Sequence, residues 1–125
     1  LLTKNEECLK AAKSAADCLI RGQLHSGGWA NHISFDPETR NELAYRIDGP
    51  ARKKARNVTS FDDDQTQSAI RFLSRLDQAL QFKDARIHET TLFALKAVLS
   101  SQYPCGAWPQ GFRAPYDASK HPVLK

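Results

Sequence analysis

The chain repeats one short motif, and this repetition constrains its fold more than any other feature. The segment from Gln23 to Trp29 reads QLHSGGW, and it returns from Gln102 to Trp108 as QYPCGAW, a spacing of 79 residues. An amphipathic stretch precedes each copy, and an aromatic residue followed by aspartate comes after each, at 35–36 and 116–117. Self-similarity of this kind is typical of helical repeat units that pack on one another.

Three stretches carry apolar residues at helical spacing. The first begins at a possible capping box, Thr3-x-x-Glu6, and ends near Gly22. The second follows a similar box at 64–67, and its apolar face is Ala69, Ile70, Leu73, Leu76 and Leu80. The third runs from Ile87 to about Ser100, after a short polar turn at 81–84. Because that turn is tight, we expect the second and third helices to be antiparallel neighbours.

The order of these elements is helix, glycine-tryptophan loop, helix, helix, glycine-tryptophan loop. It predicts an all-α fold of helical hairpin repeats with long irregular loops, in a single domain over residues 1–125. Loops that leave the same end of such helices share one face, and we expect the functional site there. The chain begins at Leu1 and ends soon after its second repeat begins, so we expect it to be the N-terminal portion of a larger domain.

Composition narrows the classes of partner. The net charge of +4 and the pI of about 9.1 favour an anionic partner. Much of the excess lies in Arg52-Lys53-Lys54-Ala55-Arg56, a run that a solvated loop also explains. We expect no nucleic-acid partner, because few aromatic residues lie among these charges, and no membrane partner, because no apolar run approaches about 20 residues.

The three cysteines carry no metal-binding or redox motif. Cys8, Cys18 and Cys105 lack the spacing of a zinc site or of a disulfide framework. We predict that they are small buried apolar residues. Cys8 and Cys18 would lie on nearly opposite faces of the first helix, so a bridge between them is not expected.

Three adjacent carboxylates precede the second helix. Asp62, Asp63 and Asp64 repel one another, so such a run is usually stabilised by a helix N-terminus, by nearby arginines or by a hard cation. Helix capping and cation binding both fit the sequence. The run lacks the spacing of an EF-hand loop, so a calcium site here requires further ligands from distant segments.

The repeated tryptophans also have two interpretations. Trp29 and Trp108 lie beside glycines, where an indole ring either stacks on a sugar or packs beneath the next helix. Repetition in register favours packing, although both residues stay candidates for substrate binding. The repeated Gln23 and Gln102 are expected to tie their loops to helix termini through amide hydrogen bonds.

Three blocks of the sequence together resemble the first half of the pectate lyases of polysaccharide lyase family ten. They are residues 23–29, the segment TSFDDDQT at 59–66 leading into IRFL at 70–73, and QYPCGAWPQ at 102–110. The resemblance implies a secreted or periplasmic enzyme with an α/α toroid that cleaves polygalacturonate by calcium-assisted β-elimination. It assigns calcium binding to Asp62, with Asp63 as second choice, and it implies an arginine base for which no position here matches the motif.

Arg56, Trp29 and Trp108 are the candidate residues for binding the acidic polysaccharide, and the rest of the parent chain is expected to be needed for turnover.

One alternative is a noncatalytic helical module that binds acidic carbohydrate or a protein partner. Glutamine-glycine-tryptophan repeats also resemble those of triterpene cyclases. The acidic catalytic motif of those cyclases is not evident in this chain.

Overall fold

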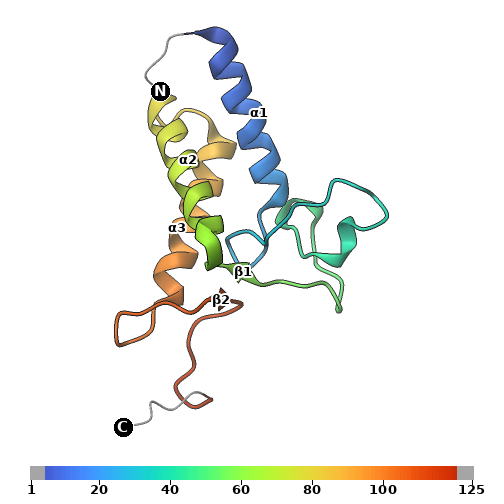
Figure 1. The fold of residues 1–125 in the computed structure, drawn as a ribbon, viewed down its shortest axis with the longest axis vertical. Coiled ribbons are helices and arrows are strands. Elements are labelled where there is room, and N and C mark those ends of the chain that lie inside the picture. Colours follow the sequence, from blue (N-terminus) through green and yellow to red (C-terminus); the bar gives the residue numbers. More distant parts are fainter. Residues whose placement is uncertain (1–4, 121–125) are drawn as a thin grey trace.

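Three α-helices supply most of the regular structure of the described chain, and Figure 1 shows how they are arranged. The computed structural model describes residues 5–120, and about half of the chain is helical. The helices are α1 (Glu6–Gly22), α2 (Gln65–Ala79) and α3 (Ala85–Ser101). Single 3-10 turns occur at Arg40–Glu42 and Arg46–Asp48, and a short kinked turn at Asp62–Asp64 leads into α2. The predominantly helical character predicted from the sequence is therefore confirmed.

The helices α2 and α3 form the predicted antiparallel hairpin. The turn between them places Gln81 and Phe82 in the left-handed region, at φ values of 56° and 60°. The helix α1 packs against this pair. The core contains one apolar stripe from each helix together with one tryptophan, and its buried members are Ala16, Trp29, Ala69, Leu73, Leu76, Ile87 and Ala94. The stripe predicted for the second helix thus lies inside the molecule.

Two of the predicted helix caps are wrong. Asn5 is the N-cap of α1, and its Oδ1 accepts hydrogen bonds from the backbone N–H groups of Glu7 and Cys8. The proposed partner Thr3 lies outside the described residues. Asp64 stands at the N-cap position of α2, but its side chain makes no capping hydrogen bond, because its carboxylate pairs with Arg71 instead.

The prediction of buried cysteines is also wrong, since all three are exposed and free. Cys8 and Cys18 lie beside the stripe of α1 that faces the core, which is narrower than the sequence pattern suggested. Cys105 lies in the second glycine-tryptophan loop, which no later described element covers. As expected, Cys8 and Cys18 do not form a bridge.

The two glycine-tryptophan loops have the same backbone geometry. In the first, the Gln23 side chain donates to the carbonyl of Gly27 at 2.9 Å, and the Trp29 indole donates to the carbonyl of Leu19 at 2.8 Å. In the second, Gln102 donates to Gly106 at 2.8 Å, and Trp108 donates to Val98 at 3.0 Å. Gly27 and Gly106 both have positive φ values, 110° and 90°. Each glutamine closes its own loop, whereas the tryptophan makes the bond to the last turn of the preceding helix, so the predicted tie of glutamine to helix terminus is wrong.

The small sheet was not predicted. The strand β1 (Thr59–Ser60) pairs antiparallel with β2 (Gly111–Phe112), in the register Thr59 with Phe112 and Ser60 with Gly111. Two residues per strand are too few for the alternating pattern that identifies a strand. Figure 1 shows this sheet at the end of the bundle where α1 and α3 end and α2 begins.

The long segment between α1 and β1 is irregular but fixed in place. Isolated bridges join Leu24 to Tyr45 and Leu43 to Arg56. The Arg46 side chain binds the side-chain oxygen of Gln23 and pairs with Glu89 of α3 at 2.5 Å. These contacts return the chain to the first glycine-tryptophan loop before β1 begins, and they bring Arg56 to the sheet end of the bundle.

Candidate functional site

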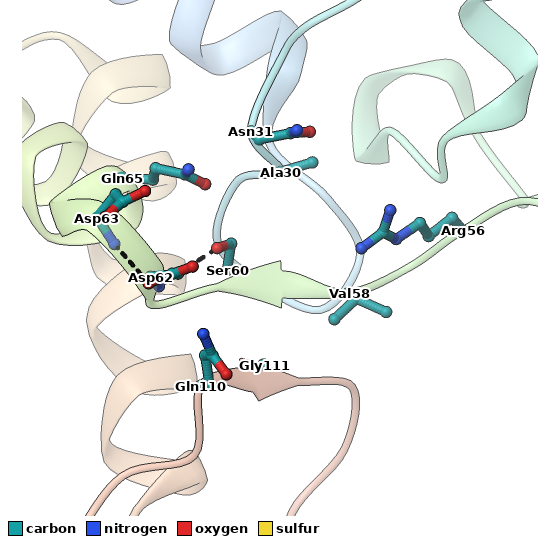
Figure 2. A pocket seen from close by; sticks show the side chains of 10 residues that line it. All are labelled: Ala30, Asn31, Arg56, Val58, Ser60, Asp62, Asp63, Gln65, Gln110 and Gly111. Atoms are coloured by element: carbon teal, nitrogen blue, oxygen red, sulfur yellow. Dashed lines mark hydrogen bonds between the residues drawn. The ribbon is translucent and has the colours of Figure 1, made fainter.

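The three sequence blocks meet at one pocket of about 420 Å³, drawn in Figure 2. The residues just after the first block follow Trp29, the second block contributes the aspartates, and the residues after Pro109 come from the end of the third block and the position after it. The pocket is lined by Ala30, Asn31, Arg56, Val58, Ser60, Asp62, Asp63, Gln65, Gln110 and Gly111. The two glycine-tryptophan loops thus lead to one face, as predicted, and Asp62 and Asp63 lie on it.

Backbone hydrogen bonds to the strand β1 and the residue after it hold both loops at the pocket. The Ser60 N–H donates to the carbonyl of Trp29 at 2.9 Å, and the Phe61 N–H donates to that of Gln110 at 2.9 Å. On α2, the Thr66 hydroxyl accepts a hydrogen bond from the Trp29 N–H at 3.2 Å. The pocket floor is thus fixed by main-chain geometry, and the side chains around it are free to contact a ligand.

The aspartate run adopts an unusual backbone that separates its carboxylates. Asp63 and Asp64 are both left-handed, with φ values of 47° and 59°. Asp62 and Asp63 line the pocket, and an Asp62 carboxylate oxygen accepts a hydrogen bond from the Asp63 N–H at 3.0 Å. Asp64 does not line the pocket, because its carboxylate turns along α2 toward Arg71.

The Arg71 guanidinium donates hydrogen bonds to Asp64 and holds the pKa of that carboxyl below its ordinary value of 3.8. The pair is solvent-exposed, with each side chain 56% accessible. Asp64 is therefore neutralised locally by an arginine, whereas Asp62 and Asp63 form no ion pair among the described residues. Of the two interpretations of the run, capping does not occur at Asp64, and the other two carboxylates are available for a cation.

The donor chemistry of the pocket suits a hard cation. Asp62 and Asp63 supply carboxylate oxygens, and Gln65 supplies an amide oxygen that is buried and has no hydrogen-bond partner among the described residues. Ca²⁺ binds six to eight oxygens from carboxylates, amides, backbone and water. Within residues 5–120 no cluster of three or more His, Cys, Asp or Glu side chains is suited to hold a metal ion, so neutral oxygens must complete the set.

Of the basic run, only Arg56 reaches this pocket. Figure 2 shows Arg56 near one end of β1, with its guanidinium directed toward the pocket, and the aspartates at the other end of the strand. Arg52, Lys53 and Lys54 are exposed in the turn before it and do not line the pocket. The Arg56 side chain makes no hydrogen bond or ion pair with any described residue, so the pocket has a free cation facing two carboxylates.

The two candidate tryptophans lie elsewhere. Trp29 is only 3% exposed and packs in the core, so it offers no free face to a sugar ring, which supports the packing interpretation. Trp108 is 49% exposed, but it does not line the pocket either. What the loops bring to the pocket are the residues after each tryptophan.

Sequence reasoning did not single out the amides of the pocket. Asn31 and Gln110 each stand two residues after a repeated tryptophan, and both line the pocket. The repeat register was the signal that would have found them, because equivalent positions of equivalent loops point to the same space. Ser60 and Gln65 flank the aspartates and carry no signal beyond that proximity.

The described helices include none long and apolar enough to span a bilayer.

The chain was compared with models of known protein families. A model described as pectic acid lyase matches residues 23–122. Neither the curated proteins nor the solved structures yielded a significant match. The matched region begins at the first glutamine of the repeat and includes every residue that lines the pocket. The chain belongs to the pectic acid lyase family.

Proposed function

We propose that this pocket is part of the active site of a pectate lyase, which cleaves polygalacturonate by calcium-assisted β-elimination. The observation that carries the proposal is the position of Asp62 and Asp63 opposite Arg56 in one pocket, within a chain of the pectic acid lyase family. This arrangement can hold a divalent cation and a uronate carboxylate side by side. The substrate class is an acidic polysaccharide.

The chemistry requires charge to be stabilised beside the reacting carbon. Removal of the proton next to a uronate carboxylate places additional negative charge on that carboxylate. Bound Ca²⁺ would stabilise this charge as a Lewis acid. In this chain Asp62 and Asp63 would hold the ion, and the unpartnered side-chain oxygen of Gln65 would complete part of its oxygen shell.

Arg56 contributes the opposite charge. A guanidinium stays protonated and binds a carboxylate through two parallel hydrogen bonds, so we assign Arg56 to substrate binding. The exposed cations just before it in the sequence would attract the polyanion toward the pocket. We assign no residue of this chain as the base that removes the proton.

The test compares two neighbouring aspartates. Asp62→Asn removes a carboxylate from the pocket, whereas Asp64→Asn removes one that faces Arg71, and asparagine tolerates the left-handed backbone there. Both variants are made in the intact parent protein, and release of unsaturated uronide from polygalacturonate is followed by ultraviolet absorbance while calcium is titrated. We expect Asp62→Asn to lower activity at least 100-fold and Asp64→Asn to keep it within about twofold.

Three outcomes are informative. Calcium-dependent product formed by the wild type but not by Asp62→Asn supports the proposal. Equal activity in wild type and Asp62→Asn would remove Asp62 from the site. Binding of polygalacturonate without any product would instead favour the noncatalytic carbohydrate-binding module.

A further inference from the structure

A second pocket adjoins the first across the small sheet. It has a volume of about 370 Å³ and shares two lining residues with the first pocket, Val58 and Gly111. Val58 directly precedes β1, and Gly111 is the first residue of β2. The two pockets therefore lie on either side of the same strand pair, and the sheet edge is their common wall.

Val58 packs closely over Gly111 where the two pockets meet. A Cβ placed on Gly111 would lie 3.1 Å from Cγ1 of Val58, closer than ordinary van der Waals contact. Any larger residue would therefore crowd Val58 at the place where the pockets meet. A linear ligand that occupied both pockets would therefore pass over Val58 and Gly111.

The second pocket combines aromatic rings with positive charge. The Tyr103 and Tyr116 rings meet edge to face, with centroids 5.5 Å apart at an angle of 84°. Arg113 is exposed, and within residues 5–120 its guanidinium has no hydrogen-bond or ion-pair partner. Lys120 lies 3.7 Å from a carboxylate oxygen of Asp117 at the rim. An aromatic ring beside a free guanidinium suits a sugar that presents a C–H face and a carboxylate.

We propose that this second pocket is a further uronate subsite, in which Arg113 binds the carboxylate and Tyr103 or Tyr116 packs on the sugar ring. This inference rests on the proposed function, because it assumes that the first pocket holds a uronate of the same polymer. The first pocket has no aromatic side chain among its lining residues and suits the reacting unit. The second has the features of a binding subsite and would hold a sugar farther along the chain.

The experiment measures affinity against oligomer length. Binding of galacturonate oligomers from dimer to hexamer is titrated calorimetrically with the full chain, in calcium, for wild type, Arg113→Ala and Arg75→Ala. Arg75 is an exposed arginine on α2 that lines neither pocket, so its variant matches the change in charge. We expect Arg113→Ala to weaken binding of the longer oligomers about tenfold, with the dimer and the Arg75→Ala control little changed.

A methyl-esterified hexamer identifies the group that is recognised. Esterification removes the carboxylate charge, so the tenfold difference between wild type and Arg113→Ala should disappear with this ligand. The same tenfold loss with the ester, or equal loss for oligomers of every length, would overturn the subsite.

The two proposals fail differently. If the wild type binds the long oligomers and Arg113→Ala binds them equally well, the subsite is wrong and the proposed function stands. If the wild type binds no oligomer of any length, the proposed function fails and the subsite with it.

Discussion

At the scale of single residues, backbone conformation gives three identical side chains different roles. Asp62, Asp63 and Asp64 are adjacent, yet two consecutive left-handed residues turn the last carboxylate away from the other two. Residues other than glycine adopt the left-handed region of backbone conformation at a cost in free energy, and that cost is smallest for Asn and Asp. The conformation thus relieves repulsion among the carboxylates and leaves two of them for the pocket.

The pairing of Asp64 with Arg71 predicts a pH-dependent contribution to stability. Because its pKa is lower in the folded protein than in the unfolded chain, the Asp64 carboxyl stabilises the fold at neutral pH. That contribution is lost as the pH falls below about 4 and through the folded pKa. Asp64→Asn should therefore be slightly less stable than wild type at pH 7 and equally stable in acid.

Urea denaturation at several pH values measures this difference. The effect should be small because the pair is exposed and screened by solvent. The variant Arg71→Gln serves as the matched partner and should abolish the same pH dependence. A difference between wild type and Asp64→Asn that stayed constant down to pH 2 would show that the ion pair is not its cause.

At the scale of elements, the two glycine-tryptophan loops have the same local structure, but the first is buried and the second is exposed. Gln23 is 1% exposed, and it donates a second hydrogen bond to the carbonyl of Thr90 at 3.0 Å. Gln102 is exposed, and among residues 5–120 its side chain bonds only within its own loop. The local motif therefore forms its own turn, and packing by α2 and α3 decides whether that turn is buried.

This comparison predicts unequal costs for equivalent substitutions. Gln23→Ala leaves the buried Gly27 carbonyl without its donor and removes a second donor from the Thr90 carbonyl of α3, so it should lower the free energy of unfolding by about 2 to 4 kcal/mol. In Gln102→Ala, water can replace the lost donor to the exposed Gly106 carbonyl, so the free energy of unfolding should fall by less than about 1 kcal/mol. Chemical denaturation of both variants gives the comparison. Similar losses for the two would show that burial of the first loop does not determine its contribution.

The same elements show what a sequence can predict. The helices α1, α2 and α3 were predicted nearly to their ends, because apolar residues at helical spacing report burial directly. The cap at Asp64 was mistaken because a side-chain pair with Arg71 competes with capping. The strands β1 and β2 carry no pattern of their own. The pocket amides Asn31 and Gln110 follow from the sequence only when the two loops are superimposed in register.

At the scale of the whole molecule, the fold brings chemistry from distant segments to one end of a helical bundle. The end of α1, the start of α2 and the end of α3 all lie beside the strand pair, as Figure 1 shows. Each loop enters the pocket just after its tryptophan. Equivalent positions of the two loops, Asn31 and Gln110, thus lie around one pocket although they are 79 residues apart.

The outer face of α3 remains apolar and open. Leu92, Leu95 and Leu99 lie three and four residues apart on one side of the helix, and they are 52%, 39% and 74% exposed. A contiguous apolar stripe of this kind tends to be covered by another surface. The closed α/α toroid stays a prediction, and it would cover this stripe with further helices.

We therefore expect the 125-residue chain, expressed alone, to self-associate through α3. The variant Leu99→Lys should raise the dissociation constant of the dimer at least tenfold, because burial of one leucine contributes about 1.5 to 3 kcal/mol. Gln78→Lys adds the same charge at an exposed position of α2 and should have little effect. Sedimentation over a range of concentrations measures both, with circular dichroism to verify the helical content. A wild-type chain that stays monomeric at high concentration would contradict the expectation, because the exposed leucines of α3 would then not drive association.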